Sequence, residues 1–148
     1  MKKLYIIIII FFLSLMPLKS IELGLIAGDI NNSTGLCYGI SVGSGMIIPI
    51  VKFEFEYYKI VDGDYKGITT GLKLKPRIGD FSPYILLGVG TDFEKFNFVL
   101  SDYKKFTFYG AGLYYYFLKM LSVRIDMRIL NYSEFSKTRI TAGIYINI

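Results

Sequence analysis

The chain has 148 residues, of which 53% are hydrophobic and 17% aromatic. This composition is too apolar for a disordered chain, and the length predicts one folded domain. The formal net charge of +5 includes basic residues near the N-terminus, so the rest of the chain is only mildly basic and nucleic-acid binding is not indicated.

The first segment has the pattern of a secretory signal peptide. Lys2 and Lys3 form a short basic region, an almost unbroken apolar run covers 4–15, and a polar break ends at Ser20. We expect cleavage after Ser20, which leaves residues 21–148 as the mature domain. An uncleaved membrane anchor is the alternative, but the apolar run is shorter than the ~20 residues that a spanning helix prefers.

From Ile21 onward, turn signals recur about every 16 residues, and the intervals between them have the composition of strands. Helical periodicity is weak throughout. The single cysteine, Cys37, cannot form an internal disulfide and is interpreted as a small strand residue. The predicted strands are Ile21–Ile30, Gly35–Gly43, Ile47–Ile60, Lys66–Pro76, Tyr84–Phe96, Phe106–Phe117, Leu121–Ile129 and Lys137–Ile148.

The clearest strand is Leu121–Ile129, in which every odd position is apolar and every even position is polar or charged. Successive side chains of a strand point to opposite faces, so Ile125 faces one way and Arg124 and Asp126 face the other. In a soluble sheet the apolar face would form the core. In a membrane barrel it would meet lipid, and the charges would point inward.

In the other strands, polar residues also occupy alternate positions and so share one face, which we call the polar parity. Acids and bases are balanced on this face, and small glycines share it, as the narrow interior of an eight-stranded barrel requires. This pattern favours the membrane barrel. A basic residue facing mid-membrane lipid would cost about 2–4 kcal/mol. We therefore predict an all-β fold, an eight-stranded antiparallel transmembrane β-barrel, with a lumenal ion-pair network formed by Lys52, Glu54, Glu56, Lys73, Lys75, Asp92, Glu94, Arg124, Asp126, Arg128 and Arg139.

Aromatic residues cluster near the predicted strand ends, as interfacial girdles do. Because aromatic residues also favour strands in general, this pattern is only partly specific. The expected girdle residues are Tyr57, Tyr58, Phe93, Phe96, Phe108, Tyr109 and Tyr132 at one end, and Tyr84, Tyr115, Tyr116 and Phe117 at the other.

Four segments resemble the small outer-membrane β-barrel proteins of the OmpA/OmpX-like superfamily: Pro83–Gly90, Tyr109–Phe117, Leu121–Arg128 and Thr141–Ile148. The resemblance implies eight antiparallel strands, short periplasmic turns, longer surface loops, no fixed enzymatic activity and a place in the outer membrane of a two-membrane bacterium. It also implies contact with the barrel-assembly machinery during insertion. The final Ile148 differs from the Phe or Tyr that usually ends the family and contributes to that recognition.

The sequence contains no histidine, which removes Ser-His-Asp triads and histidine-based metal sites. The pairs Glu54/Glu56 and Asp92/Glu94 could do acid–base chemistry, but carboxylates two residues apart beside lysines are typical of a lumenal network. Gly88 and Gly90 lie within a strand pattern and do not indicate a phosphate-binding loop. We expect neither an enzyme nor a cofactor or metal.

Three functions stay open. The first is a monomeric outer-membrane barrel in lipid, with a structural or surface-interaction role and an extracellular ligand at its loops 31–34, 61–65, 97–105 and 131–136. Phe98, Tyr103 and Lys104 are the candidate loop contacts. The second is a narrow channel, and the third is a secreted lipocalin-like barrel that binds a lipophilic ligand. Charges of both signs at this strand count favour a plugged lumen over a channel.

Overall fold

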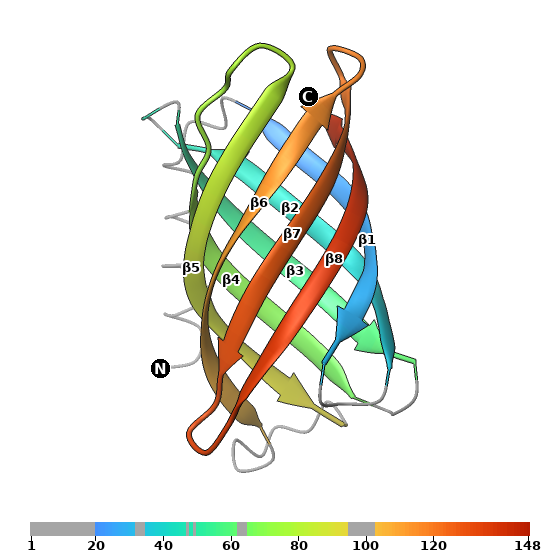
Figure 1. Ribbon diagram of the computed structural model, residues 1–148, viewed down its shortest axis with the longest axis vertical. Coiled ribbons are helices and arrows are strands. Elements are labelled where there is room, and N and C mark those ends of the chain that lie inside the picture. Colours follow the sequence, from blue (N-terminus) through green and yellow to red (C-terminus); the bar gives the residue numbers. More distant parts are fainter. Residues whose placement is uncertain (1–19, 32–34, 47, 49, 62–64, 95–102) are drawn as a thin grey trace, which may run out of the picture.

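The computed structural model describes residues 20–31, 35–46, 48, 50–61, 65–94 and 103–148. The predicted signal peptide therefore lies outside the described residues except for Ser20. The described chain forms one closed barrel of eight strands (Figure 1). The strands are β1 (Ile21–Ile30), β2 (Leu36–Gly45), β3 (Val51–Ile60), β4 (Lys66–Leu74), β5 (Phe81–Phe93), β6 (Lys104–Tyr116), β7 (Leu121–Asn131) and β8 (Ser136–Asn147).

Each strand pairs antiparallel with the next, and β8 pairs with β1 to close the ring. The closing seam ends in two backbone hydrogen bonds of 2.8 Å between Ile21 and Ile148. A closed ring leaves no strand edge unpaired, so the backbone groups of every strand can be satisfied within the sheet. The predicted fold is confirmed. No helix among the described residues is long and apolar enough to cross a membrane.

Residues 31–35, 61–65, 94–103 and 132–135 connect strands at one end of the barrel, which we call the loop end (the lower end in Figure 1). Residues 46–50, 75–80 and 117–120 connect strands at the other end, which we call the terminal end because Ile21 and Ile148 lie there. Apart from 94–103, the connections of the loop end are no longer than those opposite. The expectation of longer surface loops therefore holds for one connection only.

Every strand except β1 begins or ends one to four residues from its predicted bound, and the largest difference is in β3, which begins at Val51 instead of Ile47. β6 begins at Lys104, two residues before the predicted Phe106, because Lys104 and Lys105 continue the ladder opposite Asp92 and Thr91. β5 begins at Phe81 instead of Tyr84, although Pro83 lacks an N–H donor. Pro83 occupies an exposed position near the start of the strand, where proline is tolerated.

Burial alternates along the strands as the sequence predicts. In β7, Arg124, Asp126 and Arg128 are buried, whereas Ile125 and Met127 are exposed on the outer face. Leu25 of β1 is 70% exposed and Ile125 is 63% exposed. The apolar parity thus faces outward and the charged parity faces inward around the ring.

The inward glycines make room for aromatic rings. In five cross-strand pairs, a Cβ atom added to the glycine would overlap the aromatic ring on the neighbouring strand. Such rings cover the backbone that glycine leaves bare. The pairs are Gly24 with Tyr145, Gly67 with Tyr58, Gly88 with Phe108, Gly90 with Phe106, and Gly112 with Tyr84.

This packing corrects part of the girdle prediction. Tyr58, Tyr84 and Phe108 are buried on the inner side, not placed at a lipid interface, whereas Phe93 is buried but shares the outward parity of Lys66, its partner in the ladder. Tyr109, Tyr115 and Phe117 are exposed, whereas Phe96 lies outside the described residues. The linear pattern shows that an aromatic residue is near a strand end, but only its parity relative to the charged residues shows which face it occupies.

Replacing Gly67 by valine is expected to lower the free energy of unfolding by about 1–3 kcal/mol, because the new side chain overpacks the interior against Tyr58. Tyr58 also donates a 2.6 Å hydrogen bond to Asp92, which its displacement would break. Denaturant unfolding in lipid vesicles measures the change. Ile68→Val, at the adjacent outward position, is the control, and an equal effect of the two substitutions would contradict the interior packing described above.

Candidate functional site: charged side chains inside the barrel

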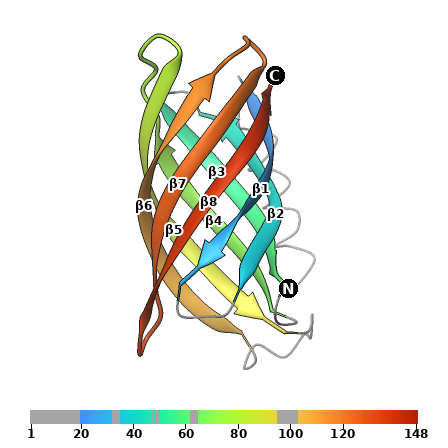
Figure 2. The same ribbon diagram turned by 45° about the vertical axis from the view of Figure 1, so that its right-hand side comes forward.

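The buried charges meet across the interior from opposite walls. In the ring of eight strands, β3 and β7 are separated by three strands in either direction, and both views place β7 in front of β3 (Figure 2). β3 contributes Glu54 and Glu56, and β7 contributes Arg124, Asp126 and Arg128. All five side chains are buried. Contacts between these strands therefore run across the full width of the interior.

Glu54 binds three cations. Its Oε2 atom accepts hydrogen bonds from Lys73 of β4 and, at 2.7 Å, from Arg124 Nη1. Its Oε1 atom accepts from Arg128 Nη2 at 2.7 Å. Lys73 also donates to the hydroxyl of Tyr114 at 2.9 Å. Charge-assisted hydrogen bonds of this kind offset the large cost of removing each ion from water.

Glu56 likewise binds three cations, and all three are guanidinium groups. Its Oε1 atom accepts from Arg124 and Arg128 at 2.7 and 2.6 Å, and its Oε2 atom accepts from Arg139 of β8 at 2.5 Å. Arg139 is fully buried. One carboxylate therefore joins side chains from β3, β7 and β8.

Asp126 completes the central group from the opposite wall. Its Oδ2 atom lies 2.8 Å from Arg128 Nη2 and 3.2 Å from Arg124 Nη2, and it accepts a 2.8 Å hydrogen bond from Tyr84. Its Oδ1 atom accepts a 2.7 Å hydrogen bond from the Thr141 hydroxyl. The central network comprises Glu54, Glu56, Lys73, Arg124, Asp126, Arg128 and Arg139.

A second ion-pair group lies toward the terminal end. Lys75 donates to Glu22 at 2.7 Å, and Lys52 lies 3.9 Å from the same Glu22 oxygen. The Lys75 ammonium also sits 3.4 Å from the ring centroid of Tyr114, a cation–π contact. Glu22 belongs to the polar parity of β1, so its position within the strand indicates that it faces inward.

Asp92 and Glu94 do not join the ion pairs, which corrects their assignment to the network among the described residues. Asp92 accepts hydrogen bonds from Tyr58 and Tyr132 instead. Burial, followed by the charge of Asp92, raises the pKa of Tyr132. Glu94 lies beyond the end of β5, where it is exposed. Its hydrogen bond with Tyr65 raises the pKa of that phenol.

The predicted loop contacts lie in different surroundings. Phe98 is outside the described residues. Tyr103 packs its ring 5.5 Å from that of Phe93, centroid to centroid. Lys104 belongs to β6, and its ammonium lies 5.6 Å from the ring centroid of Tyr65. The described contacts of Tyr103 and Lys104 are thus local, and their contact with an external partner stays a prediction.

Three neutral partners of the network were not assigned to it from the sequence: Tyr84, Tyr114 and Thr141. All three are buried and donate to or accept from the charged groups. Their parity matches that of the charged residues on their own or neighbouring strands, and this was the signal available in the sequence. Among the described residues, no group of three or more Cys, Asp or Glu side chains is arranged to hold a metal ion.

Solved structures of other proteins share this architecture. The N-terminal β-barrel domain of OprF from Pseudomonas aeruginosa matches with a TM-score of 0.75 at 17% identity, covering 87% of this chain and 97% of that domain. A de novo designed transmembrane β-barrel matches with a TM-score of 0.69 at 12% identity, covering 87% of this chain and 95% of the design. No protein-family model matches the chain, and neither does a curated protein.

The outer-membrane protein Ail from Yersinia pestis, studied in a phospholipid bilayer nanodisc, matches with a TM-score of 0.57 at 16% identity, covering 86% of this chain and 99% of Ail. Together with the apolar outer face and the charged interior, these matches define the class: a small eight-stranded transmembrane β-barrel. The resemblance to OmpA/OmpX-like barrels is confirmed at the level of the fold. The predicted location in the outer membrane of a two-membrane bacterium agrees with it.

At these identities the likeness describes the fold and leaves the activity open, because one fold supports many functions.

Proposed function

We propose that this protein is a monomeric, non-enzymatic barrel of the outer membrane, with a structural or surface-interaction role and an interior closed to ions by its own side chains. The observation that carries the proposal is the bridging of opposite walls by Glu54, Glu56 and the three buried arginines. An eight-stranded barrel has an interior just wide enough for side chains to fill.

The outer face supports insertion in lipid. Exposed Leu, Ile, Val, Phe and Tyr side chains surround the barrel, whereas the described side chains of the charged network point inward. A lipocalin-like carrier needs the reverse arrangement, with an apolar interior and a polar exterior. The carrier alternative is therefore not favoured.

Both ends of the interior add to the closure. Toward the loop end, Ile30, Cys37, Tyr58 and Ile60 form a buried apolar cluster with Tyr65 packed against it. Toward the terminal end, Tyr114 stacks against Tyr116 with ring centroids 6.2 Å apart. A continuous water path would have to pass the apolar cluster, the ion pairs and these rings, which supports a plug over a narrow channel.

The loop end is the part of the barrel that we propose to meet an extracellular ligand, with Phe98, Tyr103 and Lys104 as the first residues to test. Its connections are short apart from 94–103. An interaction surface at this end would therefore be small and centred on that connection. We also propose that the barrel-assembly machinery inserts the protein, as for other barrels of this class.

Planar bilayer recording tests the closed interior. We expect the folded barrel to insert and to show no stepwise ion conductance, because the bridging side chains leave no water-filled path. Insertion must be checked on the same preparation by retention in vesicles after high-salt and carbonate washes, and by a shift in gel mobility on boiling.

The matched variant is Glu54→Ala with Arg124→Ala, which removes both ends of one bridge together and leaves no unpaired charge from that pair. Conductance in the variant but not in the parent protein would support the plug. Stable conductance steps in the parent protein would reject it and favour the narrow channel. A protein that stays soluble without detergent would reject the membrane location itself.

A further inference from the structure

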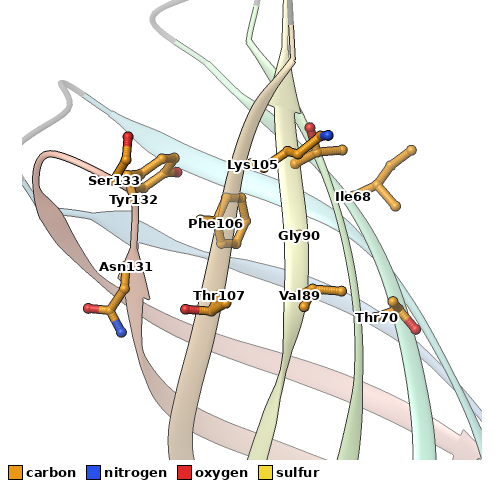
Figure 3. Close-up of a pocket in the computed structure, with 11 residues that line it drawn as sticks. Ile68, Thr70, Val89, Gly90, Lys105, Phe106, Thr107, Asn131, Tyr132 and Ser133 are labelled. Carbon is orange, nitrogen blue, oxygen red and sulfur yellow. The ribbon is translucent and has the colours of Figure 1, made fainter. Parts of the chain in front are cut away.

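A groove of about 620 Å³ lies on the outer surface of the barrel near the loop end (Figure 3). Its lining side chains come from β4, β5, β6 and the end of β7, as the close-up shows. Ile68 and Val89 provide apolar walls, Lys105 lines the groove near the loop end of β6, and Ser133 lines it from the connection that follows β7. The groove thus runs from the apolar belt toward the loop-end boundary of the membrane.

The outward positions in this groove differ from those of the rest of the outer face. Thr70, Thr91, Thr107 and Asn131 place hydroxyl and amide groups where neighbouring outward positions carry leucine, isoleucine and tyrosine. Thr107 is exposed at the surface of the groove, whereas the hydroxyl oxygens of Thr70 and Thr91 are buried beneath that surface and have no hydrogen-bond partner in the described part of the chain. Polar groups facing hydrocarbon are unfavourable, so this cluster indicates that a polar molecule lies against it.

Three lysines lie in or beside the same region. Lys105 lines the groove, and Lys66 and Lys59 point outward on the adjacent strands β4 and β3, directly opposite each other in the ladder. None of the three lies within salt-bridge distance of a described carboxylate. On the far side of the ring, the outward residue near the loop end of β1 is Asp29. Near the loop end, the outward lysines of the described strands therefore lie on β3, β4 and β6.

We propose that this groove binds the phosphorylated headgroup of a membrane lipid, with the phosphate against Lys105 and Lys66 and an acyl chain along Ile68 and Val89. Ammonium groups near a membrane surface attract anionic headgroups. The exposed Thr107 hydroxyl and the Asn131 amide supply hydrogen bonds to ester and phosphate oxygens. The inference rests on the proposed membrane location and adds a specific lipid site to it.

Native mass spectrometry of the barrel in neutral detergent tests the site, with dioleoyl phosphatidic acid and dioleoyl phosphatidylcholine as probes. We expect retention of one phosphatidic acid molecule at a concentration several-fold lower than is needed for phosphatidylcholine. Lys105→Gln should weaken phosphatidic acid binding about fivefold, and Lys66→Gln should have a similar effect. Thr107→Leu should weaken it while leaving the net charge unchanged.

Lys119→Gln is the matched control, because it removes one exposed lysine at the terminal end of the barrel. Equal weakening by Lys119→Gln and Lys105→Gln would mean general charge attraction and would overturn the site, as would equal retention of the two lipids. Insertion into phosphatidylcholine vesicles alone, measured separately, reports on the proposed function. A barrel that inserts there but shows no preference for phosphatidic acid rejects only the lipid site.

Discussion

Replacing Arg128 by methionine is expected to lower the free energy of unfolding by about 3–5 kcal/mol, the range for breaking a buried ion pair by removing one partner. Arg128 is fully buried, and its Nη2 atom lies 2.7, 2.6 and 2.8 Å from oxygens of Glu54, Glu56 and Asp126. Methionine fills similar space but leaves three carboxylates with fewer cations. Their mutual repulsion then acts in a region shielded from water.

Denaturant unfolding of the barrel in lipid vesicles measures this loss. Lys119→Met removes an exposed positive charge and should change the stability by no more than about 0.5 kcal/mol. Adding Glu54→Gln to Arg128→Met should restore part of the stability, because it removes one of the stranded charges. A loss below about 1 kcal/mol for Arg128→Met would show that the network contributes little to stability.

Replacing Ile125 by arginine is expected to cost about 2–4 kcal/mol of stability in a bilayer. Ile125 is 63% exposed on the outer face, near the middle of β7, between the inward residues Arg124 and Asp126. Arg124, one position away, is buried on the inner face, where it donates hydrogen bonds to Glu54 and Glu56. At position 125 the same side chain would face hydrocarbon, with no described acid on that face of β7.

The same unfolding measurement in vesicles tests this prediction, with Ile125→Leu as the volume-matched control. Thr138→Arg, at an outward position near the loop end of β8, should cost only about 0–1 kcal/mol, because the cost falls toward the interface. If Ile125→Arg were tolerated as well as Thr138→Arg, the middle of the outer face would be in contact with water and the membrane location would be wrong.

The strand count, the closed antiparallel fold and the face that each buried charged residue occupies could be predicted from the sequence. Each rests on a local rule: turn residues separate the strands, and a period of two assigns the faces. In β7 the alternation of Arg124, Ile125 and Asp126 is enough to choose the lipid-facing side. The same alternation, in β4 and β8, predicts that Lys73 and Arg139 point inward.

The partners of those side chains depended on the tertiary structure. Arg124 and Glu54 are 70 positions apart, and they meet because ring closure places β7 opposite β3. Asp92 lies on the predicted face but beside Tyr58 and Tyr132, so it accepts hydrogen bonds instead of joining the ion pairs.

The sequence by itself therefore determined the strands and their two faces, because alternation is a property of neighbours along one strand. Only the tertiary structure decided which charges meet across the interior, which aromatic rings cover inward glycines, and where the outer groove with Lys105 lies. Each of these depends on the register between strands and on the closure of the ring, and residues far apart in the chain contribute to them.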